Sequence, residues 1–172
     1  DLGISNNINA SDSINIELWN SSNLSASTPD HSTKVILTKT GTANATFPSY
    51  IIGGSYYLVI KNRNHIETWS ALPLTLTDTT KYDFSTASSK AYGDGVNPPM
   101  KKTNDNKYAI YAGDTNQDGG IDISDMQITE NDASNFVFGY YKSDCNGDGG
   151  ADISDMQIIE NNAGLFIFYA RP

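Results

Sequence analysis

The chain has little of what several common function classes require. Its 172 residues include one cysteine, Cys145, so no disulfide can form within the chain. Only 11 Lys and Arg stand against 20 Asp and Glu, and this net charge of -9 disfavours binding to nucleic acid and to anionic membranes. No apolar run approaches the roughly 18 residues that a membrane helix needs, so we expect no membrane insertion.

Residues for catalysis are equally sparse. His31 and His65 are the only histidines, they lie in differently patterned segments, and no serine motif of a nucleophile accompanies them. Glu17 and Glu67 are isolated carboxylates in predicted strands, which we expect at the surface rather than acting as general acids. We therefore expect a protein that is not an enzyme.

The beginning of the chain favours an exported protein. It starts at Asp1 without the charged and apolar pattern of a secretory signal, as a processed extracellular protein would. Residues 1–13 are small and polar with sparse Leu2, Ile4 and Ile8, and the Leu2–Ile4 alternation would suit an added strand.

Residues 14–85 have the pattern of antiparallel β-structure. Apolar and polar residues alternate in 14–19, 35–37 and 43–47, and 56–60 is a continuous apolar run, with further short runs at 67–69, 72–76 and 82–84. Turn residues recur every eight to twelve positions, which is typical of a sandwich. We therefore predict a mainly β fold with a small α part: an N-terminal extended segment at 1–13, a β-sandwich at 14–111 and a calcium module at 112–172.

The most specific feature is a loop that is written twice. Residues 114–125 read DTNQDGGIDISD and residues 144–155 read DCNGDGGADISD, and more than half of the positions aligned between 113–140 and 143–170 are identical. Each copy has oxygen-bearing side chains at positions 1, 3, 5, 9 and 12 with Gly at position 6, the spacing that a hard, oxygen-seeking cation requires. The sequence predicts two Ca²⁺ sites whose ligands are Asp114, Asn116, Asp118, Gly120 (backbone carbonyl), Asp122 and Asp125 in the first loop, and Asp144, Asn146, Asp148, Gly150, Asp152 and Asp155 in the second.

The type of calcium site follows from two details. Position 12 is Asp125 or Asp155, not the bidentate Glu of calcium sensors, and residues 108–113 before the first loop look extended rather than helical. We expect structural calcium, with apo loops that repel themselves until metal binds. Eight of the 20 carboxylates lie in the loops, so two ions would bring the net charge to about -5. Cys145, at position 2, should be a small side chain that points away from the metal.

A helix is expected after each loop. Residues 123–131 and 153–161 have helical apolar spacing, and Ser124 and Ser154 are the expected N-caps. The apolar patches 136–138 and 166–168 then repeat, and we expect the two halves to face each other so that both are buried.

These duplicated loops, each followed by one helix, resemble the dockerin family over residues 112–168. The resemblance implies binding to a cohesin domain through residues 123–132 and 153–162. A wider resemblance, carried by 56–71, Tyr82, Phe84, 91–93 and the duplicated loops, is to C-terminal regions of secreted surface proteins from bacteria with type IX secretion. It implies an extracellular location, and the sequences around Ser13 and Thr79 resemble the O-glycosylation sites of that group.

Together these features predict a non-catalytic, calcium-stabilised structural module that self-associates into a cell-surface fibre or adhesive structure by strand addition. Two alternatives remain open. One is a dockerin-type module that docks a secreted protein onto a cohesin-like scaffold. The other is a carbohydrate-binding sandwich that uses Trp19 or Trp69 to hold a glycan.

Overall fold

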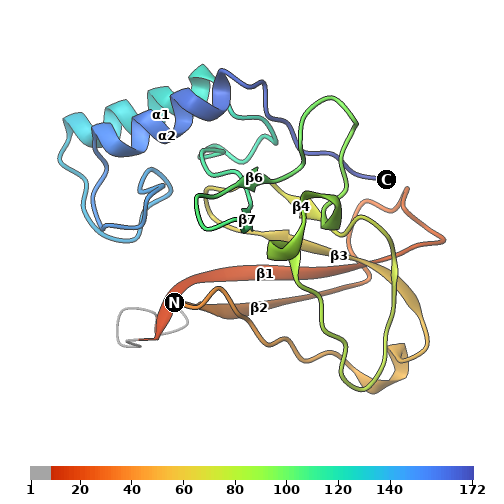
Figure 1. Ribbon diagram of the computed structural model, residues 1–172. Coiled ribbons are helices and arrows are strands. Elements are labelled where there is room, and N and C mark those ends of the chain that lie inside the picture. Colours follow the sequence, from red (N-terminus) through yellow and green to blue (C-terminus); the bar gives the residue numbers. More distant parts are fainter. Residues whose placement is uncertain (1–8) are drawn as a thin grey trace.

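A computed structural model describes residues 9–172, and residues 1–8 lie outside the described part. Two antiparallel sheets and two helices make up the fold, in which the helices lie together at one end, above the sheets (Figure 1). The prediction of a mainly β fold with a small α part is confirmed. The elements are β1 (Ala10–Asn20), β2 (His31–Thr38), η2 (Ser49–Ile51), β3 (Ser55–Lys61), β4 (Thr68–Trp69), β5 (Leu74–Thr75), η3 (Phe84–Thr86), η4 (Ser88–Lys90), β6 (Lys101–Lys102), β7 (Tyr108–Ala109), α1 (Ile123–Ser134) and α2 (Ile153–Ala163).

The larger sheet has five strands in the order β2-β1-β3-β4, with β5 also pairing with β3. All its pairings are antiparallel, and β1 pairs with β2 through residues 10–18 on one side and with β3 through residues 15–20 on the other. β2 pairs with β1 alone, so within residues 9–172 its outer edge carries no ladder hydrogen bonds. β6 and β7 form a separate two-stranded sheet just before the first predicted calcium loop.

Both faces of β1 are buried. Leu18 packs with Ile51 and Tyr56 on one face, while Trp19 packs with Val59 and Trp69 on the other. Glu17 shares the second face, where it accepts a hydrogen bond from Trp19 Nε1 at 2.9 Å and pairs with Lys61 at 3.3 Å. The expectation that Glu17 lies at the surface is wrong, because these partners satisfy a carboxylate that the sheet buries.

Several predicted strands differ in the structure. The segments 43–47 and 82–84 alternate in polarity but form no strand. Residues 10–13 belong to β1, so the predicted boundary after residue 13 falls inside a strand. The Leu2–Ile4 alternation lies outside the described residues.

The two helices lie at the predicted positions, but their N-cap residues differ from the predicted ones. Asp122 and Asp152 are the N-caps, and each accepts a hydrogen bond from the N–H of the serine two residues later. Asp125 and Asp155 accept the N–H of those caps in return, which completes two capping boxes. The predicted caps, Ser124 and Ser154, are wrong. The aspartate at loop position 12 accepts the N–H of position 9, three residues earlier, and this bond makes position 9 the N-cap.

The helical module and the sheet share a hydrophobic core. Ile66, from the turn after β3, packs with Tyr111, Ile121 and Ile159, and Cys145 and Ile167 complete this cluster. The duplicated module thus packs against the β-structure through this shared cluster. Within residues 9–172, no helix has the length and apolar character to cross a membrane.

This packing gives a matched pair of substitutions in one helix. Ile159→Ala should destabilise the protein by about 2–5 kcal/mol, since it leaves a cavity at a side chain that is fully buried. Ile153→Ala removes the same atoms from a side chain that is 76% exposed and should change the unfolding free energy by less than about 0.5 kcal/mol. Urea unfolding measures both. Equal effects of the two substitutions would contradict the assigned core.

Candidate calcium site

The two repeats are interlocked by reciprocal backbone pairing. In the first loop, Ile121 N–H donates to the carbonyl of Ile167 at 3.0 Å, and in the second loop Ala151 N–H donates to the carbonyl of Val137 at 3.1 Å. Each loop therefore pairs with the segment that follows the other repeat's helix. This exchange supports the expectation that the two halves face each other.

The backbone of both loops has the sharp turns that the sequence pattern requires. Gly119 and Gly149, at position 6, have φ angles of 93° and 95°. Position 4 is also left-handed, with φ of 64° at Gln117 and 79° at Gly147. These turns bend each loop around its own side-chain oxygens.

The carboxylate at position 12 closes each loop. Asp125 is fully buried, and its Oδ1 accepts the N–H groups of Thr115 at 2.8 Å and Asn116 at 3.0 Å. Asp155 repeats this with Cys145 at 2.8 Å and Asn146 at 2.9 Å. Position 12 thus joins the start of each loop to the helix that follows it.

Asp114, at position 1, has a buried oxygen that no hydrogen bond satisfies. It is only 2% exposed, and its Oδ1 has no hydrogen-bond partner. Burial, and then the negative charges of Asp125 and Asp118, raises the pKa of Asp114 to about 6. A buried acceptor beside two carboxylates is unfavourable alone and favourable next to a cation.

The remaining predicted ligands are engaged within their loops. Asp118 Oδ1 accepts the N–H of Gly120 at 3.1 Å, and its Oδ2 accepts from the Asn116 amide at 2.8 Å. Asp148 makes the equivalent bonds to Gly150 at 3.1 Å and Asn146 at 2.9 Å. Asp122 and Asp152 cap the helices.

The described residues contain no group of three His, Cys, Asp or Glu side chains assembled as a metal site. The donors nevertheless fit a hard cation in kind, and Asp114 Oδ1 is free to bind one.

The turn after β3 holds the module onto the sheet. Asn64 is fully buried, and its Nδ2 donates to the carbonyls of Lys142 at 3.0 Å and Asp144 at 2.7 Å. The carbonyl of Asn64 accepts the N–H of Gly113 at 2.7 Å, so this residue touches the entrance of both loops. Beside it, burial lowers the pKa of His65 to about 4 and keeps the ring neutral. Turn residues at 62–64 predicted a turn here, but not its contacts to both loops, because those partners lie far along the chain.

Cys145 points into the core shared by module and sheet, as expected for a side chain directed away from the metal. It is 8% exposed, and burial raises the pKa of its thiol to about 12. A thiol in this state is a poor nucleophile.

Three other predicted sites have different outcomes. Ser13 is buried in β1, and its Oγ lies 3.1 Å from the hydroxyl of Tyr140, so it does not fit as a glycosylation site in the folded protein. Thr79 is exposed and stays a prediction. Trp19 and Trp69 are 5% and 1% exposed, so neither indole offers the sugar platform that the carbohydrate-binding alternative needs.

The apolar patches after the helices are only half buried. Ile167 is 3% exposed, but its neighbours Phe166 and Phe168 are 73% and 60% exposed. Phe136 and Phe138 are likewise 77% and 72% exposed. The expectation that both patches are buried between the halves is wrong for the phenylalanines. Phe136 and Phe166 have left-handed φ angles of 53° and 55°, so neither patch is a continuous extended segment with one face toward the other half.

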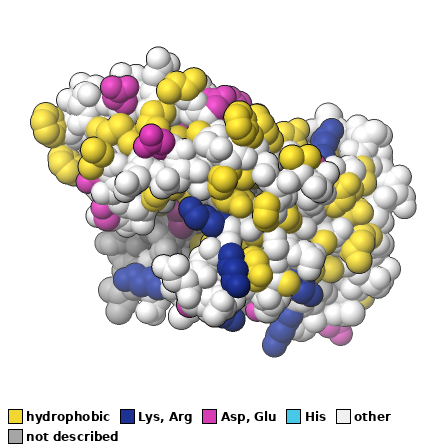
Figure 2. Space-filling view, turned by 45° about the horizontal axis from the view of Figure 1, so that its top comes forward, with side chains coloured by type: hydrophobic (Ala, Val, Ile, Leu, Met, Phe, Trp, Pro, Cys, Tyr) yellow, Lys and Arg dark blue, Asp and Glu magenta, His cyan; other side chains and the backbone are white. Residues whose placement is uncertain are grey.

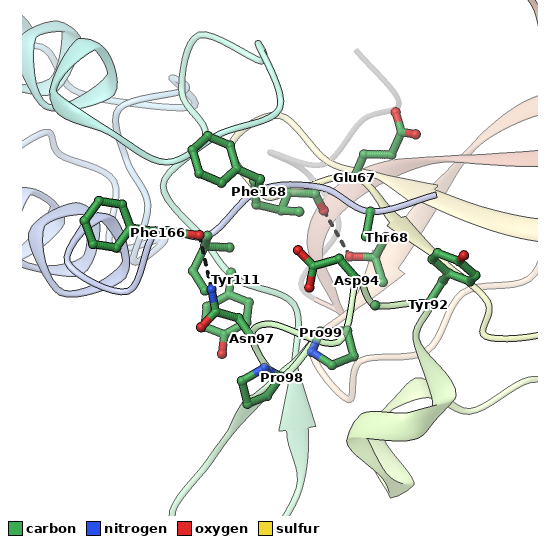
Figure 3. Close-up of a pocket in the computed structure, with 14 residues that line it drawn as sticks. Glu67, Thr68, Tyr92, Asp94, Asn97, Pro98, Pro99, Tyr111, Phe166 and Phe168 are labelled. Atoms are coloured by element: carbon green, nitrogen blue, oxygen red, sulfur yellow. Dashed lines mark hydrogen bonds between the residues drawn. The ribbon is translucent and has the colours of Figure 1, made fainter. Parts of the chain in front are cut away.

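A small cavity lies between the sheet, the 92–99 segment and the C-terminal segment (Figure 3). Asn97 donates from its amide to the carbonyl of Phe166 at 3.3 Å across this cavity. Its volume of about 30 Å³ holds about one water molecule, so we do not consider it a ligand site.

No family model, curated protein or solved structure matches the chain. The resemblance to dockerins is thus carried by the loop residues themselves.

Asp114→Asn tests the cation site with effects of opposite sign. The folded-state pKa of Asp114, about 6, lies above its ordinary 3.8, so calcium-free protein loses stability as the pH rises through this range. At pH 7.5 in chelator, Asn should therefore raise the free energy of unfolding, by on the order of 1–3 kcal/mol. In calcium the same substitution should reduce stability, because it weakens a ligand.

Differential scanning calorimetry in chelator and in calcium measures both effects. Asp78→Asn, at an exposed position outside the loops, is the matched control and should change neither value. A loss of stability in both conditions would show that the Asp114 carboxylate makes a structural contact and is not a cation ligand.

Proposed function

We propose that the chain is a non-catalytic, calcium-stabilised structural module of the cell surface. The observation that carries the proposal is the buried, unpartnered Oδ1 of Asp114 next to the charges of Asp118 and Asp125. Oxygen donors at this spacing are what calcium takes in loops of twelve residues.

The same residues would hold the ions in both loops. Positions 1, 3, 5, 9 and 12 offer side-chain oxygens, and Gly120 and Gly150 offer their carbonyls. Bound calcium would neutralise carboxylates that otherwise repel one another and would fasten each loop to its helix. Because each loop pairs with the segment that follows the other repeat's helix, the ions would stabilise the whole module.

Self-assembly by strand addition is the second part of the proposal. Among the residues that the structure describes, none pairs with the outer edge of β2, a strand of eight residues that is a template for a strand from another copy. We predicted residues 1–13 as the donor strand. Residues from Ala10 onward cannot serve as the donor, because they already pair with β2 of their own chain. The proposed donor is therefore limited to residues 1–8, which lie outside the described part, since Asn9 accepts a hydrogen bond from the N–H of Lys39 in its own chain. Copies joined head to tail in this way would form an open fibre.

We also keep the predicted sandwich of residues 14–111 as a proposal. The five-stranded sheet would be one layer. Phe47, Ile51 and Leu76, from segments between strands, pack on the face that a second layer would cover.

Chelation is the direct test of the calcium proposal. EDTA should lower the melting temperature, because calcium at a hundredfold excess over Kd stabilises the folded state by about 2.7 kcal/mol per site. It should also expose the Cys145 thiol to Ellman's reagent as the module around residues 113–170 loosens. An unchanged melting temperature in EDTA, with no calcium found by elemental analysis, would contradict the assignment of the two calcium sites.

Deleting residues 1–8 tests strand donation. The shortened chain should remain folded, since it keeps all of β1, but should no longer form long assemblies by electron microscopy or light scattering. A proline at Val35, a β2 residue, should have the same effect at the accepting edge. Assemblies of unchanged size in the deletion variant would end the strand-donation proposal.

Docking to a partner is a second candidate function, favoured by exposed apolar side chains on the module. Ile123 and Ile153, at the starts of the helices, are 75% and 76% exposed, and hydrophobic side chains are scattered over the end of the molecule that carries the helices (Figure 2). A groove of about 480 Å³ next to the second loop is lined by Phe136, Phe138 and Ile153. Calcium-dependent capture by a cohesin-bearing protein would support this function, and assembly of the pure chain without any partner would count against it.

A further inference from the structure

The two loops carry the same ligand residues but meet different surroundings at position 1. Asp114 in the first loop has an unpartnered Oδ1. Asp144 in the second loop has both oxygens engaged, since Oδ1 accepts the N–H of Gly147 at 2.8 Å and Oδ2 accepts the N–H of Gly149 at 3.3 Å. The two position-1 carboxylates therefore differ in how far hydrogen bonds already satisfy their oxygens.

The larger difference is a positive charge that the sheet places against the second loop. Arg63 donates from Nη1 to the carbonyl of Asp144 at 2.9 Å, and its Nη2 lies 3.8 Å from Oδ2 of the same residue. In the first loop, the position-1 carbonyl of Asp114 accepts instead from the neutral amide of Gln117 at 2.7 Å. Within residues 9–172, no basic side chain forms an ion pair with Asp114.

Arg63 is held firmly in this position. Its Nε pairs with Asp12 Oδ2 at 3.2 Å, and its guanidinium lies over the ring of Tyr140, 4.5 Å from the centroid. The side chain is 14% exposed, so solvent and salt screen its charge only partly. The charge therefore cannot swing away from the loop without breaking contacts to β1 and Tyr140.

We infer that the two calcium sites are unequal, with residues 114–125 forming the tighter site and Arg63 weakening the site at residues 144–155. A guanidinium that already pairs with the position-1 carboxylate both competes with calcium for that oxygen and repels the ion. This inference rests on the proposed calcium binding. It makes Arg63, which is outside both repeats, the residue that sets the order in which they fill.

Calcium titration calorimetry on the chelator-stripped protein tests the inference. The wild type should show two separated binding steps, with Asp114→Asn removing the tighter step and Asp144→Asn removing the weaker one. This assignment needs no change at Arg63. Equal steps, or loss of the tighter step in Asp144→Asn, would overturn the inference while leaving calcium binding intact.

Substitution of Arg63 then identifies the cause. Arg63→Met, which keeps the apolar stem, should tighten the weaker step roughly ten- to hundredfold, because it removes a charge that repels the ion and competes for its ligand oxygen. Arg63→Lys keeps the charge and should stay close to the wild type. Lys61→Met is the control, because it removes a charge two residues away that pairs with Glu17 and Glu67 and should move neither step.

The possible outcomes separate the two claims. Absence of any calcium binding in the folded wild type would defeat the proposed function itself. A weaker step that does not tighten in Arg63→Met, in protein whose circular dichroism is unchanged, would overturn the role of Arg63. If Arg63→Met does not fold, the two Asp→Asn assignments still decide whether the sites are unequal in the predicted order.

Discussion

The structure of the duplicated module depends on the reciprocal pairing between the two repeats. Each loop finds its backbone partner in the segment after the other repeat's helix, through Ile121 with Ile167 and Ala151 with Val137. A single repeat would leave these groups without partners and would expose the buried faces of its helix. The duplication in the sequence is therefore a requirement of the fold, since one copy supplies what the other lacks.

The same pairing explains why the loops and the sheet behave as one body. Asn64, in a turn of the sheet, holds the carbonyls of Lys142 and Asp144 and also accepts the N–H of Gly113. Ile66, from the same turn, enters the core formed by both repeats. Events in either loop thus reach the β-structure through a short, fully buried contact. A rigid cap on the sheet follows from this geometry more naturally than a switch that opens.

The repeated parts of the molecule could be predicted from sequence because their determinants are local. Helical spacing located α1 and α2, and Gly at position 6 marked a left-handed turn in both loops. The predictions that were wrong concern features that depend on residues distant in the sequence, or on two neighbouring residues that suit the same position equally well. Serine and aspartate are both good N-caps, and only the reach of Asp125 back to Asp122 selects between them. Alternation in 166–168 did not reveal which residue faces the core, and the turn residues at 62–64 predicted a turn but not its contacts to both loops.

The central claim is that calcium and reciprocal pairing make the duplicated module a single cooperative unit. Amide hydrogen exchange, followed residue by residue by NMR with and without calcium, tests it most directly at Ile121 and Ala151. The account predicts that both amides are protected in calcium and lose protection together when calcium is removed, although they belong to different loops. Persistent protection of one amide while the other exchanges freely would show two independent repeats and would contradict the account.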